Sequence, residues 1–364
     1  MNKKKLLVIE YTAHFRNALD NFKIFEKFFD CYFLTSKKNK NKINLTNKKI
    51  VFRFPQPLIL FYVIFNGFRF KYIYFSTPHE YPDYPNTLIE KIFFIYTFML
   101  YLIIFFIYKK KIIFQLRSLH RYFPNISSVH KKRTFYSRLR NFYLKNCENI
   151  ICESEYLKKK LVNMLGKKNC LDKKILVIYY AYARKKIKIK IKFNREKINI
   201  GILGSVDKNR KNYNTLTKVL EDKFFLNKKI SLTFLGSANT KFAEDKINEF
   251  SKYTKNIISK NYFSEKEFQK FGKKCTFLIS LNNKTNFYGK YRMSGCFGDA
   301  IILKKYLYCP SFEDPIREFS DFTFYYNNLK SMIKNIKFCT KKSITVTFDS
   351  LKYDQALKNI KNNF

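Results

Sequence analysis

Short apolar runs bounded by polar turns recur along the first half of the chain, and stretches with helical period separate them. Such runs are typical of buried parallel strands. The predicted strands cover residues 6–10, 71–77, 111–118, 149–154 and 174–180, and the predicted helices cover residues 15–29, 88–108 and 137–145. Strands that alternate with helices predict an α/β domain built on a parallel sheet.

The rhythm breaks at residues 183–197, ARKKIKIKIKFNREK, where lysine and isoleucine alternate. This alternation suits either a solvated edge strand or a connection between domains, and we favour the connection. The rhythm then restarts, with predicted strands at 198–205, 231–237, 256–263 and 276–281 and predicted helices near 213–222, 241–253, 265–272 and 294–305. We therefore predict two doubly wound, Rossmann-like α/β domains: residues 1–183, a linker at 184–197, residues 198–350, and a C-terminal helix at 351–364.

A candidate membrane segment lies at Ile92 to Tyr108, which has seventeen residues without a charge and is followed by three lysines. We favour a helix buried against the sheet. The alternatives are a helix at the membrane interface, with lysines at the head groups, and a membrane span, for which seventeen residues are barely enough.

The charge balance favours anionic partners. The chain has 72 basic and 27 acidic residues, a formal net charge of +45, and such a field attracts nucleic acid, anionic lipid or phosphorylated small molecules. An AT-rich genome also produces this excess of lysine without selection for binding. The basic residues are spread along the chain and form no known nucleic-acid-binding motif, so we do not expect a nucleic-acid partner.

Metal and disulfide frameworks are not expected. The eight cysteines form no CxxC pair, and the four histidines form no HExxH motif. Reduced cysteines that fill the core are consistent with a cytoplasmic protein. The first apolar run ends at Glu10 and is too short for a signal-peptide core.

Candidate chemistry appears where the strands of the second half end, because ligands of doubly wound sheets sit at the carboxyl ends of strands. In GILGSVDKNRKNY, Gly204 would let the backbone approach a ligand, and Arg210 beside Lys211 can hold two phosphate groups. The alternative is a plain turn with a solvated basic face. Gly236 follows the next strand, and we interpret it as a simple turn.

A third loop, YGKYRMSGCFGDA at residues 288–300, holds three of the nine glycines. We predict that Ser294 is the N-cap of the next helix and that Gly295 leaves the first amides uncovered. With Arg292 nearby, these amides suit a diphosphate. Asp299, one turn into the helix, can accept hydrogen bonds from sugar hydroxyls. The alternative is that Asp299 only complements the helix dipole.

These segments resemble a known family. GILGSVDKNRKNY, FLGS, NYFSEKEFQKFGKKCTFLIS and SGCFGDAIILKKYLYCP are similar, in this order, to the donor-binding domain of GT-B glycosyltransferases near glycosyltransferase family 4. NCENIICESEYLKKKL and KILVIYYAYA are similar to the segments that close the family's N-terminal domain. The resemblance spans roughly residues 100–315. It implies an N-terminal acceptor-side domain that faces a C-terminal nucleotide-sugar donor domain across a cleft.

The resemblance also implies roles for single residues on the donor side. Arg210 and Lys211 would neutralise the donor diphosphate. Ser294 and Gly295 would offer it backbone amides, and Asp299 would hold the nucleotide ribose.

One position departs from the family pattern. Tyr291 stands, next to Arg292, where the family has the first acidic residue of E-x7-E, a residue that contacts the transferred sugar. The departure leaves the identity of the sugar open.

Candidates on the acceptor side come from the ends of the N-terminal strands. The resemblance implies a histidine near the transferred sugar, and His120 is closest to that place, although Arg117 could occupy it instead. A general base for the acceptor hydroxyl should be an aspartate, a glutamate or a histidine. Glu80 and Asp83 are candidates, and the remaining histidines of this kind are His14 and His79.

We therefore expect a glycosyltransferase that needs neither metal nor cofactor and uses a nucleotide-sugar as substrate. A cell-surface polysaccharide or lipid-linked oligosaccharide is the expected acceptor. We expect a cytoplasmic protein, and the alternative is peripheral attachment to an anionic membrane surface at the inner face of the cell membrane. The alternative is a nucleotide-sugar epimerase or a related sugar-nucleotide enzyme on the same fold, and a basic nucleic-acid-binding protein is a third reading.

Overall fold

The structure is a computed structural model in which the chain forms two compact units. The first unit contains Met1–Tyr179 and Asp354–Phe364, and the second contains Tyr180–Tyr353. The structure describes residues 3–10, 15–36, 50–54, 56–76, 87–123, 131–179, 182–191, 197–226, 228–284, 288–341 and 344–364.

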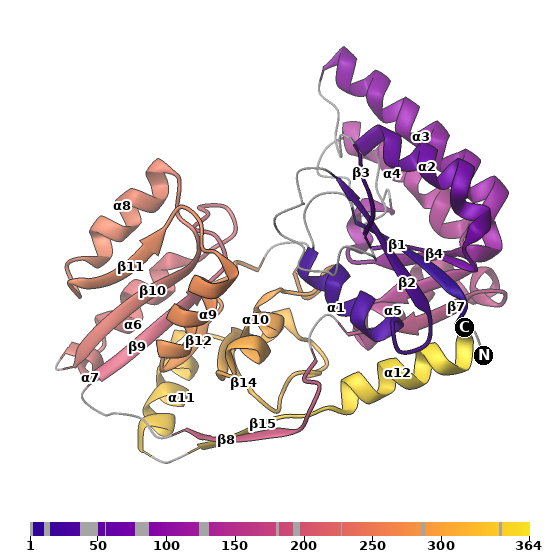
Figure 1. The fold of residues 1–364 in the computed structure, drawn as a ribbon. Helices are drawn as coiled ribbons and strands as arrows, with labels where there is room; N and C mark the ends of the chain where they lie inside the picture. The colour runs from indigo at the N-terminus through magenta and orange to yellow at the C-terminus, as the bar shows by residue number, and fades with distance from the viewer. Residues whose placement is uncertain are drawn as a thin grey trace. The chain divides into compact units, whose positions relative to one another are not determined.

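The first unit is built on a seven-stranded parallel sheet in the order β3-β2-β1-β4-β5-β6-β7 (Figure 1). The strands are β1 (Lys5–Glu10), β2 (Asp30–Ser36), β3 (Ile50–Phe54), β4 (Tyr72–Phe75), β5 (Ile112–Leu116), β6 (Asn149–Cys152) and β7 (Lys174–Val177). The five predicted strands of this half are present. The sequence patterns did not predict β2 and β3.

Helices cover this sheet and include the end of the chain. They are α1 (Phe15–Phe25), α2 (Gln56–Asn66), α3 (Leu88–Tyr108), α4 (Lys131–Asn146), α5 (Glu155–Leu165) and α12 (Leu351–Asn363). The last helix returns to the first unit, where the Asn359 amide donates to the carbonyl of Val177 at 3.0 Å and the Tyr72 hydroxyl donates to the carbonyl of Phe364 at 3.2 Å.

Helix α3 contains the predicted candidate membrane segment. Its inner face packs on the sheet, with the Tyr101 ring 5.5 Å from that of Phe75 and the Phe105 ring 6.1 Å from that of Phe114. Within the described residues it is the one helix long and apolar enough to cross a membrane, yet 39% of its most apolar window is buried inside the protein. The prediction of a helix against the sheet thus holds for one face of α3, while the other face is exposed.

The second unit is built on a six-stranded parallel sheet in the order β11-β10-β9-β12-β13-β14. The strands are β9 (Lys197–Leu203), β10 (Lys229–Ser237), β11 (Asn256–Lys260), β12 (Phe277–Ile279), β13 (Leu307–Pro310) and β14 (Thr323–Tyr326). The helices are α6 (Tyr213–Leu220), α7 (Lys223–Leu226), α8 (Lys241–Phe250), α9 (Glu265–Lys274), α10 (Cys296–Leu303) and α11 (Leu329–Lys341). This strand order is that of a doubly wound sheet, and its direction reverses between β9 and β12.

The segment favoured as a linker, residues 184–197, contains a strand. Ile187–Ile191 forms β8, which pairs antiparallel with β15 (Ile344–Phe348) in a two-stranded sheet. The alternating lysines and isoleucines therefore form the solvated strand that was the less favoured interpretation.

Candidate functional site

A small pocket of about 100 Å³ lies at the carboxyl ends of β9 and β12, where the strand order of the second sheet reverses. The crevice at such a switch point is the usual ligand site of doubly wound sheets. The pocket is lined by Gly204, Ser205, Arg210, Lys211, Asn282, Tyr288, Ser294, Gly295, Cys296 and Asp299. Of the eight residues predicted for the donor site, six line this pocket, and Tyr291 and Arg292 are not among its lining residues.

Backbone pairing brings the two main loops of the pocket together. Lys211 and Asn282 form an antiparallel bridge, and the amide of Asn283 donates to the carbonyl of Arg210 at 2.8 Å. The amide of Asn212 donates to the carbonyl of Leu281 at 2.7 Å. These bonds hold the loop after β9 against the loop after β12, although the two loops are far apart in the sequence.

Two glycines shape the floor of the pocket. Gly204 has φ +81°, a conformation that favours glycine. Gly236, which the sequence suggested was a simple turn, packs on it: a Cβ at Gly236 would lie 2.3 Å from the carbonyl carbon and oxygen of Gly204. Gly236 is therefore required for the close contact between β10 and the pocket loop.

Asp207 positions Arg210. The Arg210 guanidinium donates to the Asp207 carboxylate at 2.8 Å, and the same carboxylate accepts the amide of Asn209 at 2.8 Å. Partial burial alone would raise the pKa of Asp207, but the hydrogen bonds from Asn209 and Arg210 outweigh it and lower that pKa. Burial works against the charge of Arg210 as well, and its pKa is nevertheless raised by Tyr288 and Asp207.

Lys211 lies deeper than Arg210. Its side chain is buried, and its ammonium donates to the carbonyl of Leu203 at 2.8 Å. A Cβ at Gly204 would lie 3.2 Å from the Lys211 Nζ. An ammonium has three donors, and one of them is used in the bond to Leu203. This bond anchors the Lys211 side chain at the wall of the pocket, with its charge beside Gly204.

The start of α10 lies within one residue of the prediction. The helix is assigned from Cys296, and Gly295 before it already has a helical backbone, with φ −65° and ψ −15°. The predicted N-cap, Ser294, is buried, and its hydroxyl oxygen accepts the backbone amide of Cys296 at 3.5 Å and the side-chain amide of Asn282 at 3.2 Å. The bond to Cys296 is of the kind that an N-cap side chain makes with the second amide of a helix. Asp299 lies in the first turn, as predicted.

Tyr288 is a pocket residue that the sequence did not indicate. Its ring lies 5.7 Å from the Arg292 guanidinium, and Tyr288 and Arg292 form a backbone bridge. Arg292 thus packs on the tyrosine that lines the pocket. The Lys290 ammonium lies 5.4 Å from the centre of the Tyr291 ring. Asn282 also lines the pocket and was not predicted. Its place directly after the predicted strand at 276–281 was the feature of the sequence that could have indicated it.

Glu313 is a second residue that sequence reasoning missed. It is fully buried behind the pocket and accepts a hydrogen bond from the Ser280 hydroxyl at 2.6 Å. Burial raises the pKa of Glu313, while hydrogen bonds from Ser280 and Ser294 and the charge of Lys211 oppose that rise. The pocket therefore has a cationic front and a buried carboxyl group behind it.

A close backbone contact explains the glycine at position 289 in the loop at residues 288–300. Gly289 has φ +66°, and a Cβ at this position would lie 1.5 Å from the carbonyl oxygen of Phe312. The glycine lets the loop that carries Tyr288 lie directly on the backbone next to Glu313.

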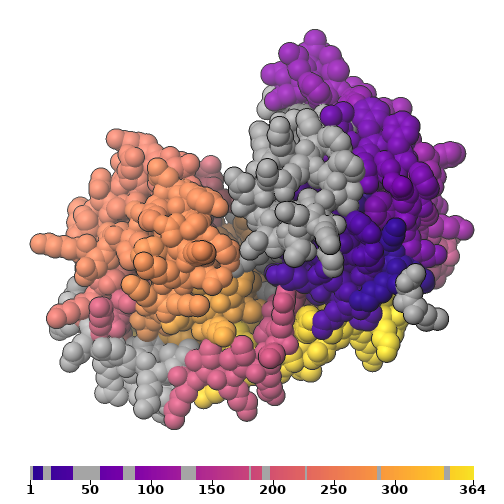
Figure 2. Space-filling view, viewed as in Figure 1, coloured from indigo at the N-terminus to yellow at the C-terminus, as the bar shows by residue number. Residues whose placement is uncertain are grey.

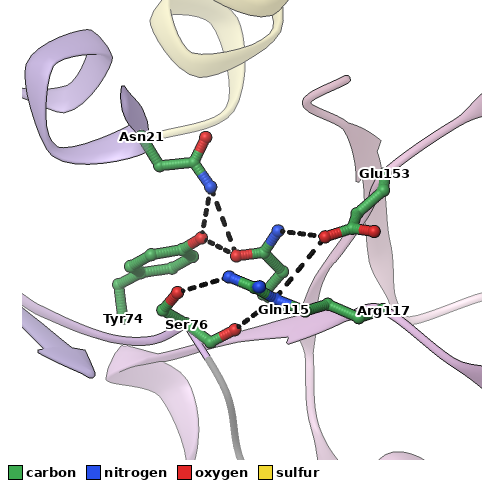
Figure 3. A network of polar contacts seen from close by, with 6 residues as sticks. All are labelled: Asn21, Tyr74, Ser76, Gln115, Arg117 and Glu153. Atoms are coloured by element: carbon green, nitrogen blue, oxygen red, sulfur yellow. Dashed lines mark hydrogen bonds and ion pairs between the residues drawn. The ribbon is translucent and has the colours of Figure 1, made fainter. Parts of the chain in front are cut away.

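The first unit has a buried polar network at the carboxyl ends of its strands β4, β5 and β6 (Figure 3). The Arg117 guanidinium donates to the backbone and hydroxyl oxygens of Ser76 at 3.0 and 2.8 Å and lies 3.5 Å from the Glu153 carboxylate. The same carboxylate accepts the Gln115 amide at 3.2 Å.

The network continues toward α1. The side-chain amide of Asn21 donates to the Tyr74 hydroxyl at 2.6 Å and to the side-chain oxygen of Gln115 at 3.2 Å (Figure 3). The Tyr74 hydroxyl donates to the same Gln115 oxygen. Burial raises the pKa of Tyr74, so its hydroxyl keeps its proton. The network ties α1 to three strands of the sheet.

The predicted acceptor-side residues are only partly described. Arg117 is held inside the buried network, and the ring of His120 lies 2.5 Å from the Ser118 hydroxyl through its Nδ1. Glu80, together with His14, His79 and Asp83, lies outside the described residues.

The cysteines behave as core residues. Seven of the eight are buried, and none forms a disulfide. Burial raises the pKa of Cys296, the cysteine at the pocket, to about 11, so its thiol keeps its proton near neutral pH. Among the described residues, no group of three or more histidine, cysteine, aspartate or glutamate side chains could hold a metal ion.

Comparisons with known proteins identify the fold class. No protein-family model and no curated protein matches the chain. Among solved structures, the chain is similar to a structure described as trehalose-6-phosphate from E. coli bound with UDP-2-fluoro glucose. The TM-score is 0.56 at 9% identity, and the match covers 99% of this chain and 96% of the other.

Two further structures show the same similarity. An α,α-trehalose-phosphate synthase (UDP-forming) from Burkholderia vietnamiensis has a TM-score of 0.51 at 7% identity, covering 100% of this chain and 96% of that one. A UDP-N-acetylglucosamine 2-epimerase from Rickettsia bellii has a TM-score of 0.52 at 12% identity, covering 99% of this chain and 95% of that one. The chain has the GT-B fold, with two Rossmann-like domains, as predicted.

Proposed function

We propose that this protein is a glycosyltransferase that takes a sugar from a nucleotide-sugar donor bound in the pocket of the second unit. The observation that carries the proposal is the meeting of Arg210, Lys211 and the start of α10 around one pocket at the switch point of the sheet. Two cationic side chains and the amides of a helix N-terminus suit a diphosphate. Of the similar structures, one holds UDP-2-fluoro glucose and another is a UDP-forming synthase, and this similarity supports the proposal of a nucleotide-sugar donor.

The pocket residues divide the work of binding the donor. Arg210 and Lys211 face the diphosphate, and Gly204 allows the backbone to approach it closely. Asp299, in the first turn of α10, accepts hydrogen bonds from the ribose hydroxyls. The small pocket volume suits the diphosphate, and the rest of the donor extends beyond it.

Charge stabilisation is the main catalytic contribution that these residues can make. When the bond between the sugar and the diphosphate breaks, negative charge grows on the departing phosphate oxygens. Preorganised donors at Arg210, Lys211 and the α10 amides stabilise that charge without reorganisation. The proposed reaction therefore uses these residues in place of a metal ion.

The finer assignment follows the resemblance of the sequence to glycosyltransferase family 4. We propose a cell-surface polysaccharide or a lipid-linked oligosaccharide as acceptor at the cytoplasmic face of the membrane, because the basic surface and the apolar run at 92–108 suit such an acceptor. On that assignment, the strand ends of the first unit, which carry Arg117 and His120, serve the acceptor.

The experiment is a binding and turnover assay with UDP-, GDP- and dTDP-sugars. We expect one nucleotide class to bind by calorimetry, and binding to weaken about 10- to 100-fold in Arg210→Ala and Asp299→Ala, because each change removes a charge-assisted hydrogen bond. Lys208→Ala is the matched control, since Lys208 is exposed on the same loop and does not line the pocket. If no nucleotide binds, or if the control weakens binding as much as Arg210→Ala, the proposal is wrong.

A nucleotide-sugar epimerase is the second candidate, favoured by the similarity to the Rickettsia enzyme. Both candidates bind the same donor, so binding does not separate them. Product analysis does: a transferase releases the nucleoside diphosphate when an acceptor is present, whereas an epimerase returns a nucleotide-sugar of changed configuration without any acceptor.

A further inference from the structure

We propose that the first unit docks on an anionic membrane through the outer face of α3 and the adjoining end of α2. We call this surface the apolar face. It consists of Leu58, Phe65, Phe68, Leu88, Ile92, Ile95, Met99, Ile103 and Phe106. Figure 1 shows α2 and α3 side by side on one side of the first sheet, and Figure 2 shows their atoms, in purple, at the surface.

The exposed positions of α3 follow the period of a helix. Ile92, Ile95, Met99 and Phe106 are 59%, 58%, 50% and 91% exposed, and their spacing puts them on one side of the helix. A helix that is apolar all round is normally buried all round. Here the outer stripe is as apolar as the inner one, although nothing in the described part of the chain covers it.

Helix α2 and the 3-10 turn Gly67–Arg69 extend the apolar face. Phe65 and Phe68 are 68% and 66% exposed. The Tyr108 hydroxyl donates to the carbonyl of Ile64 at 2.7 Å, and the Lys111 ammonium donates to the carbonyl of Phe68 at 3.2 Å. These bonds fix the end of α2 beside the end of α3, so the exposed phenylalanines continue the stripe.

Basic residues border the apolar face. In the segments 56–71 and 87–111 the single acidic residue is Glu90, and the basic residues are Arg69, Lys71, Lys91, Lys109, Lys110 and Lys111. Glu90 is engaged in a capping box with Thr87 at the start of α3. An apolar surface rimmed by lysines matches a membrane interface with anionic head groups, where each cation near the surface adds to binding.

The contacts of the inner face favour docking over spanning. Phe94 and Ile104 are fully buried, and the Tyr143 hydroxyl of α4 donates to the carbonyl of Phe98 at 3.0 Å. If α3 left the sheet to cross a bilayer, it would uncover the core residues Phe75 and Phe114. An interfacial helix keeps these contacts and buries only its outer side in lipid.

A second copy of the chain is a poorer match for the same surface. The chain carries a formal net charge of +45, and pairing two apolar faces would bring their lysine rims together. Like charges at such an interface repel each other, whereas anionic lipids neutralise them.

Vesicle flotation tests the proposal. The full chain is mixed with phosphatidylcholine vesicles or with vesicles of equal parts phosphatidylcholine and phosphatidylglycerol. We expect binding to the anionic vesicles, weakened at least tenfold in the triple variant Ile95→Gln, Met99→Gln and Ile103→Gln. The matched control changes Ile316 and Leu351 to glutamine, two exposed apolar residues of the second unit, and should bind as the wild type does.

The basic rim gives a separate arm of the experiment. The variant Lys109→Gln with Lys110→Gln should lose affinity for anionic vesicles and reduce the dependence of binding on salt. Circular dichroism and thermal unfolding check that each variant is folded. Absence of flotation by the folded wild type would overturn the proposal, and so would equal binding by the triple variant. A dimer in sedimentation that only the triple variant dissociates would assign the surface to a second copy instead. Because nucleotide binding is scored separately, either proposal can fail without the other.

Discussion

The hydroxyl of Ser280 donates a hydrogen bond of 2.6 Å to the carboxyl group of Glu313, and both side chains are completely buried behind the pocket of the second unit. Ser280 directly follows β12, and Glu313 follows β13. The bond links the ends of two neighbouring strands under the residues proposed to bind the diphosphate.

This relationship predicts a pH dependence. Burial raises the pKa of Glu313 above its ordinary value of 4.5, so the folded protein binds this proton more tightly than the unfolded chain does. The stabilisation from the proton is complete below pH 4.5 and is lost as the pH rises through the raised pKa. Glu313→Gln cannot ionise, so its free energy of unfolding should improve relative to the wild type as the pH rises toward neutrality.

Urea unfolding at a series of pH values measures this difference. A difference between variant and wild type that stays constant from pH 4.5 upward would contradict the raised pKa. Asp314 is not a suitable control because its carboxylate accepts the amides of Glu318 and Phe319. Asp245→Asn, at an exposed position in α8, is suitable.

Gly289→Ala should destabilise the protein far more than Gly166→Ala. Both glycines have a positive φ, but a Cβ at Gly289 would lie 1.5 Å from the carbonyl oxygen of Phe312, whereas nothing lies within 4 Å of one at Gly166. A positive φ alone costs a residue other than glycine about 1–3 kcal/mol. The clash at Gly289 raises the expected cost to about 2–5 kcal/mol. Denaturant unfolding of both variants checks the order, and equal costs would contradict the contact with Phe312.

Asp207→Asn should weaken nucleotide binding without unfolding the protein. Asparagine keeps an acceptor for the amide of Asn209 but loses the charge that orients the Arg210 guanidinium. A loss of about 1 kcal/mol, or roughly fivefold in affinity, is expected. Calorimetric titration with the nucleotide measures it. An unchanged affinity in a folded variant would show that Asp207 does not position Arg210 for the ligand.

The buried pair of Arg117 and Glu153 provides a test of structural against catalytic roles. Their side chains are 11% and 5% exposed, and Arg117 also donates twice to Ser76. Glu153→Ala should cost about 3–5 kcal/mol because it leaves a buried charge without its partner. The double variant Arg117→Met, Glu153→Leu should recover much of this stability.

Activity then separates the roles. If Arg117 only supports the fold, the stable double variant keeps its turnover number once it is saturated with donor and acceptor. If turnover collapses while the thermal midpoint is restored, Arg117 takes part in the reaction, as the sequence suggested.

Much of the fold was predictable because its strands are buried on both faces. Apolar runs such as residues 6–9 and 200–203 stand out between polar positions, and the helices between them keep their period. Strands β13 and β14 were harder to recognise. Leu307–Pro310 ends in a proline and Thr323–Tyr326 is rich in tyrosine, and their pairing in the sheet depends on neighbours that the local pattern does not contain.

The candidate site was predictable in its parts. Gly204, Arg210 and Asp299 follow strands or begin a helix, so their types and positions pointed to a ligand edge of the sheet. The bond from the Cys296 amide to the Ser294 hydroxyl agrees with the predicted capping role, whereas the bond from the Asn282 side chain joins segments that the local pattern does not connect.

By itself, the sequence determined two α/β domains and a set of basic and glycine-rich loops at the strand ends, because periodicity and turn chemistry act between near neighbours in the chain. Only the tertiary structure decided that Gly236 packs on Gly204, that Gly289 makes room beside Phe312, and that Glu313 lies behind the pocket. These relationships join segments separated by many residues. They depend on which strands become neighbours in the sheet, and that choice follows from the packing of the whole domain rather than from any short stretch of it.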